Sequence, residues 1–188
     1  MRLWRISDFA DLSGQGGLLA PARWHSRLSR IVYLADHPAA ALLEVLVHLE
    51  VDADEFPDIF QLLAIDAPDD IAFEALDRAR LPGNWAQDFS VTGSIGDDWL
   101  ETARSALMQV PSAIVPAALN WLLNPAHPDA ARVVIADAVR APFDPRLFRV
   151  FKSAETPPAP APRRRAPGRS PRPSGARGRR RRRSSSPA

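Results

Sequence analysis

A sharp change in composition at residue 153 limits the part of this chain that can fold. Residues 153–188 consist almost entirely of Pro, Arg, Ser, Ala and Gly, and they contain 11 Arg but a single acidic residue, Glu155. Such a segment has almost no apolar surface to bury, which is typical of disorder. The sequence therefore predicts one folded domain over residues 1–152 and a disordered basic tail over residues 153–188.

The net charge of +2 for the whole chain hides two parts of opposite sign. The tail has a net charge of +10, whereas residues 1–152 hold 13 of the 24 basic and 21 of the 22 acidic residues, a net charge of −8. An acidic domain lacks the basic surface of a nucleic-acid-binding protein, so direct DNA binding by the folded part is not expected. The tail could bind phosphate backbones or an acidic partner, be a passive extension, or come from a shifted reading frame.

The amino acids that are missing exclude several classes of site. The chain has no Cys, so disulfides, a thiol nucleophile and a zinc–thiolate site are excluded. No apolar run reaches the length that spans a membrane, and the N-terminus, MRLWRISD, turns polar too early for a secretory signal. We therefore expect a soluble cytoplasmic protein.

Local patterns predict a single α+β domain with a mixed sheet and flanking helices. Short β-branched, aromatic and apolar runs predict strands at residues 3–6, 29–35, 59–65, 106–110 and within 131–138. Asp36-His37-Pro38 supplies a cap and a first-turn Pro for a helix that reaches about Glu50. Shorter helices are expected around residues 72–80 and 98–105.

Glu44 places a carboxylate in the middle of the apolar helix segment AALLEVLVHL, residues 40–49. An unpaired buried carboxylate would cost several kcal/mol, roughly, or would take up a proton. Glu44 therefore needs a partner or a cavity that a ligand fills. One candidate partner is local, because His48 lies one helical turn further along the chain.

Four other residues carry weaker signals when each is taken alone. Arg5 follows Trp4 and Arg23 precedes Trp24, which suits either a surface cation over an aromatic ring or an anion-binding guanidinium. Tyr33 is the only Tyr in the chain, and its strand pattern favours a core ring with a satisfied hydroxyl. Ser112 follows a strand end without the sequence of a nucleophile elbow. The four His lack metal-ligand spacing, and no phosphate-binding glycine pattern occurs.

The order and spacing of these segments resemble the RES-domain family. The segments are LWRI, ARWHS, IVYLADHPAAALLEVLVHL, VPSAIVP, NWLLNPAHPD and FDPRLF, and together they span roughly residues 2–150. The family consists of bacterial toxins that are usually encoded beside an Xre-type helix-turn-helix antitoxin. The resemblance implies a fold similar to ADP-ribosyltransferases, with residues 1–152 as an NAD-binding catalytic domain.

The resemblance also assigns roles to residues by motif. It matches Arg23, Glu44 and Ser112 to the Arg, Glu and Ser of the family name, Tyr33 to the Tyr of the strand before the helix, and Arg5 to the Arg of the first strand. Glu44, Arg23, Tyr33 and Ser112 are then the expected catalytic residues, and Arg5, Arg23, Tyr33 and Ser112 the expected NAD-binding residues. NAD is a substrate in this family, so no cofactor and no metal are expected.

Two residues beside Arg23 depart from the family pattern. Ala22 stands where the family usually has Gly, and His25 stands where Asn is frequent. The resemblance implies an Xre-type antitoxin as partner, and a homo-oligomer or a toxin–antitoxin hetero-oligomer. Three functions remain open at this point: NAD cleavage with phosphate or water as acceptor, ADP-ribosylation of a protein, and a non-enzymatic role as partner of a DNA-binding antitoxin.

Overall fold

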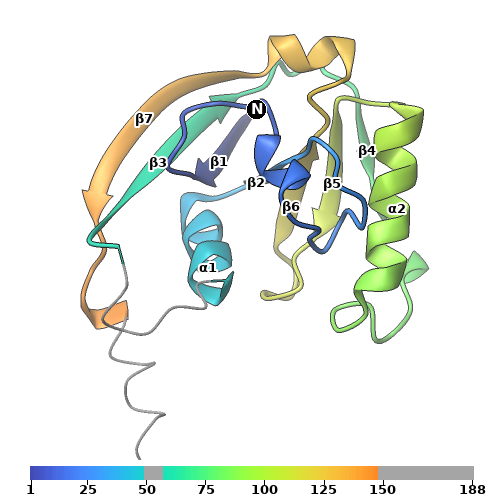
Figure 1. Cartoon of the computed structure of the whole chain (residues 1–188), viewed down its shortest axis with the longest axis horizontal. Helices are drawn as coiled ribbons and strands as arrows, with labels where there is room; N and C mark the ends of the chain where they lie inside the picture. The colour runs from blue at the N-terminus through green and yellow to red at the C-terminus, as the bar shows by residue number, and fades with distance from the viewer. Residues whose placement is uncertain (49–56, 148–188) are drawn as a thin grey trace, which may run out of the picture.

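The computed structural model describes residues 1–48 and 57–147 and shows an α+β domain with a mixed sheet, as the sequence predicts (Figure 1). The strands in this part of the chain are β1 Arg2–Ile6, β2 Val32–Ala35, β3 Ile59–Asp66, β4 Phe73–Ala75, β5 Leu107–Pro111, β6 Leu119–Leu123 and β7 Val134–Pro142. The α-helices are α1 Pro38–His48 and α2 Phe89–Thr102, and short 3₁₀ turns are η1 Gln15–Leu18, η2 Arg78–Arg80 and η3 Pro128–Arg132. None of the described helices is long and apolar enough to cross a membrane.

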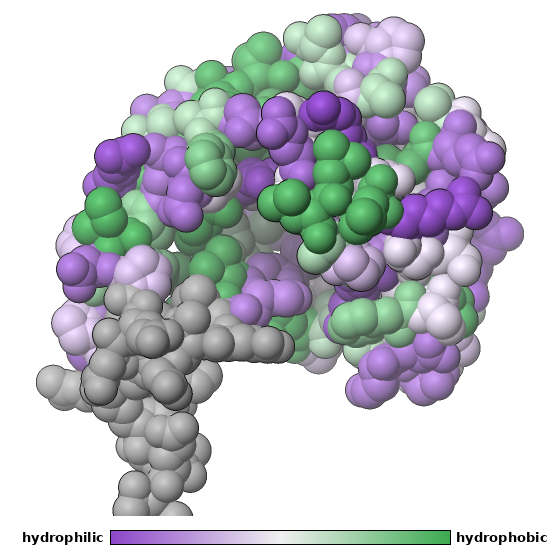
Figure 2. Space-filling view, in the orientation of Figure 1, coloured by the Kyte–Doolittle hydropathy of each residue, from purple (hydrophilic) through white to green (hydrophobic). Residues whose placement is uncertain are grey.

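The strands form one sheet in the order β4-β5-β6-β2-β1-β3-β7, in which β4 and β5 are parallel and all other neighbours are antiparallel. The ladder is thinnest between β1 and β2, which pair only through Trp4 and Ala35. Figure 1 shows β7, β3 and β1 on one side of this point and β6, β5 and β4 on the other, with α1 between the two halves and α2 along the second. The helix that carries Glu44 therefore lies where the two halves of the sheet diverge, and the space-filling view is hollowed between these halves (Figure 2).

Side chains on the two faces of the sheet build two separate apolar clusters. Alternation along the strands sends Leu34 to one cluster, together with Leu3 and Leu63, and Tyr33 to the edge of the other. The second cluster lies under α2 and contains Trp24 and Trp99. Trp99 is fully buried, and its indole N–H donates to Ser105 Oγ at 3.0 Å, so its polar atom is satisfied.

Most of the predicted strands are confirmed within one to three residues at their ends, and α1 begins at Pro38 as predicted. Within the predicted cap segment Asp36-His37-Pro38, the cap is His37, because its Nδ1 accepts from Ala39 N at 3.1 Å and its carbonyl accepts from Ala41 N at 3.1 Å. The predicted end of this helix at Glu50 lies outside the described residues. The domain boundary at residue 152 lies outside them too.

Other secondary-structure predictions were wrong. The segment 72–80 is the strand β4 followed by the 3₁₀ turn η2, because residues 73–75 pair with residues 107–109 of β5. The helix expected at 98–105 begins at Phe89, where the Asp88 side chain caps it by accepting from Ser90 N at 2.9 Å. Strand β6 was not predicted, and β7 runs to Pro142 rather than ending by residue 138.

Candidate active site

The Glu44 carboxylate is bound by two residues from the β5–β6 hairpin. Glu44 Oε1 accepts from Asn120 Nδ2 at 2.6 Å and from Ser112 Oγ at 3.3 Å. No described residue donates to Oε2, and this oxygen is not fully buried. One oxygen of the carboxylate is therefore fixed by the protein, and the other is open to a ligand.

The local pairing of Glu44 with His48 does not form. The His48 ring contacts the backbone carbonyl of Glu44, with Nδ1 at 2.7 Å from the oxygen, and the side chain is exposed. The carboxylate turns instead toward residues that lie 68 and 76 positions away in the chain. The partners of this half-buried acid thus come from distant parts of the chain rather than from its own helix.

Ser112 is a linker between the carboxylate and a turn. It is 6% exposed and follows the last residue of β5, and its Oγ accepts from Ile114 N at 3.1 Å and Val115 N at 3.2 Å. Since these amides occupy the oxygen, the hydroxyl hydrogen points to Glu44. Ser112 therefore donates to the carboxylate while two backbone amides hold its oxygen at the turn.

Arg23 occupies a two-residue turn whose ends are tied together. Ala22 N donates to His25 O at 3.0 Å, and His25 N donates to Ala22 O at 3.2 Å. Positive φ angles at described non-glycine residues occur only at Ala103 and Ala117. Ala22 therefore adopts this turn without the left-handed conformation that would favour Gly.

The Arg23 guanidinium is held on one edge and over one ring. Its Nη1 donates to Ala86 O at 2.8 Å, and its central carbon lies 4.2 Å from the centroid of the Phe89 ring. Partial burial lowers the pKa of Arg23, and the negative charge of Glu44 opposes this shift. The negative charge of Glu44 thus reaches the Arg23 guanidinium.

Helix α2 fixes the loop that carries Arg23. The Asp97 carboxylate accepts from Ser26 N at 3.1 Å and also from the Ser26 hydroxyl. Gly96 lies so close to this loop that an added Cβ would be 1.7 Å from the carbonyl oxygen of Trp24. The glycine allows the helix and the loop to approach, and Asp97 then ties them together.

Tyr33 and His25 brace the same loop from within. The Tyr33 hydroxyl accepts from Trp24 N at 3.2 Å and lies 2.8 Å from His25 Nδ1. The other ring nitrogen of His25 faces the carbonyls of Gly17, at 3.3 Å, and Ala20, at 3.1 Å, so it donates and Nδ1 accepts from the hydroxyl. Burial raises the pKa of Tyr33, which keeps the hydroxyl protonated.

The structure links Arg23, Tyr33, Glu44 and Ser112, but it gives Arg5 no contact with them. Arg5 pairs with Leu63 across the β1–β3 ladder, which places it on the sheet face opposite to Tyr33. Burial lowers the pKa of Arg5, and no described residue accepts a hydrogen bond from its guanidinium. Its role in NAD binding stays a prediction.

Asn120 belongs to the site and was not singled out from the sequence. It lies on β6 opposite Ala35 and Val110, and so on the same face as Tyr33. The only signal in the sequence was its place at the start of the NWLLNPAHPD segment.

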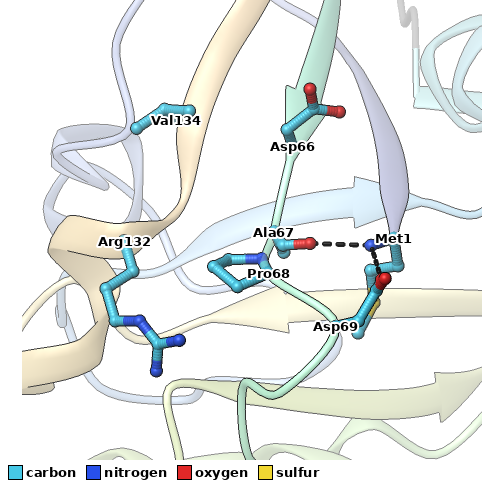
Figure 3. Close-up of a pocket in the computed structure, with 7 residues that line it drawn as sticks. All are labelled: Met1, Asp66, Ala67, Pro68, Asp69, Arg132 and Val134. Carbon is cyan, nitrogen blue, oxygen red and sulfur yellow. Dashed lines mark hydrogen bonds and ion pairs between the residues drawn. The ribbon is translucent and has the colours of Figure 1, made fainter.

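A separate hollow of about 440 Å³ lies beside the chain terminus and contains none of these residues (Figure 3). The amino group of Met1 donates to Ala67 O at 2.7 Å and to Asp69 at 2.6 Å, and Arg132 pairs with Asp70. The remaining acid of the lining, Asp66, pairs with Arg2, so each charged group of the hollow already has a partner. No group of three or more His, Asp or Glu in the described part of the chain is placed to hold a metal ion. The cluster around Glu44 is therefore the better candidate for chemistry.

Comparison with known proteins identifies the family. The RES domain model matches residues 2–144. Toxin Res of Pseudomonas putida is 45% identical over 153 residues, which cover 79% of this chain and 100% of the relative. The Prs ADP-ribosylating toxin of a Sphingobium strain is 36% identical over 156 residues, covering 78% of this chain and 96% of the relative.

The fold has a solved counterpart. A chain in the crystal structure of the M. tuberculosis MbcT–MbcA toxin–antitoxin complex superimposes with a TM-score of 0.60 and 18% identity, over 81% of this chain and 89% of that chain. At this level of identity the likeness concerns the fold alone. The family model and the curated relatives show more: this chain belongs to the RES-domain family, and the relatives it matches there are toxins.

Proposed function

We propose that the chain is a cytoplasmic toxin that degrades NAD by cleaving the bond between nicotinamide and ribose, with phosphate or water as acceptor. The observation that supports this function best is the arrangement of Glu44. Its Oε1 is held by Asn120 and Ser112, its Oε2 has no described partner, and its charge reaches the Arg23 guanidinium. A fixed anion beside a guanidinium suits a substrate that becomes cationic at one atom and carries phosphates at another.

The chemistry needs a carboxylate but no general acid. The nicotinamide nitrogen of NAD is cationic, so when the C–N bond breaks its electron pair returns to the ring and nicotinamide leaves as a neutral base. The ribose carbon becomes an oxocarbenium ion, which Glu44 Oε2 stabilises through its charge. Water then adds to this carbon and loses a proton to give ADP-ribose, or phosphate adds to give the phosphorylated sugar.

Arg23 is assigned to the pyrophosphate. Only its Nη1 is committed, to the carbonyls of Trp85 and Ala86, so the remaining N–H groups can bind phosphate oxygens as a fork. The Phe89 ring holds the plane of the guanidinium. Arg5, which lies on the opposite face of the sheet, is kept as a separate candidate for NAD binding, and Tyr33 holds the Arg23 turn in place. NAD is the substrate in this proposal, and no cofactor is invoked.

We also propose that a protein antitoxin with an Xre-type helix-turn-helix domain neutralises the toxin in a hetero-oligomer. The fold neighbour is a chain of a toxin–antitoxin complex, and this supports the proposal. Co-expression with the product of an adjacent gene, followed by purification on a tag carried by the toxin, tests it. Recovery of the toxin alone, from co-expressing cells whose growth is still inhibited, would refute it.

Transfer of ADP-ribose to a protein is the second candidate function. It is favoured by one observation, that the relative from Sphingobium is named an ADP-ribosylating toxin. The same carboxylate and guanidinium would serve, because only the acceptor differs. A non-enzymatic role as the partner of a DNA-binding antitoxin is the third.

One experiment separates the three. The purified full-length chain is incubated with NAD in the presence and absence of phosphate, and nicotinamide release and protein-bound ADP-ribose are measured by mass spectrometry. Glu44→Gln is the test variant, and Glu101→Gln, an exposed acid on α2, is the matched control. Nicotinamide release without labelled protein supports NAD degradation, labelled protein supports transfer, and intact NAD with a folded wild type refutes both.

A further inference from the structure

Asn120 makes the shortest contact with the Glu44 carboxylate. Its Nδ2 donates to Oε1 at 2.6 Å, whereas the bond from Ser112 measures 3.3 Å. Asn120 sits on a strand that pairs on both sides, with β2 and with β5. A donor fixed in the interior of a sheet is better able to orient a carboxylate than a donor on a loop.

The other end of the same amide is left without a partner. Asn120 Oδ1 is a buried side-chain oxygen to which no described residue donates, and it is alone in this among the described side chains. A buried acceptor without a donor is unfavourable, so the fold would be expected to avoid it. Rotating the amide would not help, because Oδ1 would then face the Glu44 carboxylate, and two acceptors repel.

The unsatisfied oxygen is therefore the consequence of aiming the N–H₂ group at Glu44. An apolar residue would pack better at this position, since its neighbours on the same face of the sheet include Leu122 and Val110. The polar side chain is retained at an energetic disadvantage, and this is characteristic of residues that serve a site rather than stability.

We propose that Asn120 is a positioning residue that holds Oε1 of Glu44 so that Oε2 is presented to the ribose of the substrate. This inference rests on the proposed cleavage of NAD. The terminal torsion of a Glu side chain is broad, and a donor on one oxygen confines the carboxylate to one plane. Because the ribose becomes cationic only in the transition state, misplacing Oε2 lowers kcat and leaves KM nearly unchanged.

Two substitutions at position 120 test this. Asn120→Leu keeps the size of the side chain but removes the donor, and its kcat is expected to fall on the order of 10²-fold, the effect of about 1 Å of misplacement. Its KM should stay within about threefold, since a group that acts only in the transition state does not hold the ground state.

Asn120→Asp gives the readout that a structural role would not produce. Two carboxyl groups at the distance of Asn120 and Glu44 share one proton, so at low pH the protonated Asp still donates to Glu44. As the pH rises and this proton is lost, the two anions repel and Oε2 moves away. The ratio of variant to wild-type kcat should therefore fall with rising pH.

The matched control is Asn124→Asp, the same change at a buried amide that follows the other end of β6 and donates to the carbonyl of Leu100 at 3.2 Å. Circular dichroism at each pH confirms that every variant is folded during the assay. For Asn124→Asp, the ratio of kcat to that of the wild type should show no dependence on pH over the range in which the protein stays folded.

The outcomes distinguish a failure of the role of Asn120 from a failure of the proposed NAD cleavage. The wild-type arm reports on the function: if folded wild type leaves NAD intact with water, phosphate and protein acceptors, both proposals are overturned. With an active wild type, a folded Asn120→Leu that keeps its kcat, or an Asn120→Asp whose ratio is flat with pH, overturns the role of Asn120 alone. A loss of kcat with a falling ratio supports it.

Discussion

Replacing Gly96 by Ala should displace the loop that carries Arg23, although Gly96 is not itself a site residue. An added Cβ would lie 1.7 Å from Trp24 O and 2.7 Å from Trp24 C, whereas ordinary contact begins at 3.4 Å. The obstacle is backbone, so no side chain can rotate away. Relief requires α2 and the loop to separate by about 1.7 Å, the difference between the two distances.

This movement has an effect on stability and an effect on activity. Overpacking of this kind costs about 3 kcal/mol at the upper end of the usual range, and the better helix propensity of Ala returns about 1 kcal/mol. The net loss of about 2 kcal/mol corresponds to a fall in Tm of about 4–8 °C for a domain of this size. Arg23 adjoins Trp24 in the displaced turn, so NAD consumption should fall by about 10²-fold or more.

Three glycine variants measured by thermal unfolding and by NAD consumption check this reasoning. Gly83→Ala is the control, because no atom lies within 4 Å of its added Cβ, and it should behave as wild type. Gly93→Ala should be intermediate, since its Cβ would meet Ser26 Cβ at 3.2 Å. Wild-type Tm and activity in Gly96→Ala would refute the claim that α2 positions the Arg23 loop.

Four further outcomes are expected. Glu44→Gln should lower kcat by about 10²–10³-fold, the effect of removing a direct electrostatic contact to the transition state, with a Tm close to wild type; a variant that unfolds instead would show that the acid is structural. Arg23→Lys should raise the KM for NAD by about tenfold, because a single ammonium replaces a fork held over an aromatic ring, and an unchanged KM in steady-state assays would remove Arg23 from the phosphate site. Tyr33 is the only Tyr in the chain, so absorbance at 295 nm should show that it ionises above the ordinary tyrosine pKa of 10.0. The folded state then keeps this proton to higher pH than the unfolded state does, so the free energy of unfolding should fall as the pH rises above about 10. A normal titration midpoint would contradict the burial of the hydroxyl. Deleting residues 153–188 should leave turnover unchanged, because every site residue precedes the tail, and a large drop on truncation would give the tail a catalytic role.

Local sequence patterns predicted those elements whose cause is local. The start of α1 follows from Pro38 and from the apolar repeat behind it, and β2 and β3 follow from runs of β-branched and apolar residues. Helix α2 begins nine residues before the predicted start at 98. This start was missed because the two glycines of the helix lower its intrinsic helix propensity, and their contacts with Trp24 and Ser26 form only in the fold. Those contacts cross the domain, so no window of sequence contains them.

The site was predictable only to the extent that single residues stand out. Glu44 was identifiable because a carboxylate in an apolar helix needs an explanation. Asn120 did not stand out, because a single Asn in a short strand segment is unremarkable until the register places it opposite Ala35 and under Glu44. The specific likeness to ADP-ribosyltransferases and the NAD-binding role of Arg5 stay predictions.

The kind of partner that Glu44 has bears on what it can do. No described residue forms an ion pair with it, and its two contacts come from a neutral amide and a neutral hydroxyl. A guanidinium in direct contact would fix the carboxylate equally well, but it would also cancel most of the field that a developing cation feels. Neutral donors orient the acid and leave its charge available, while Arg23 stays tied to the carbonyls beside α2 at the edge of the site.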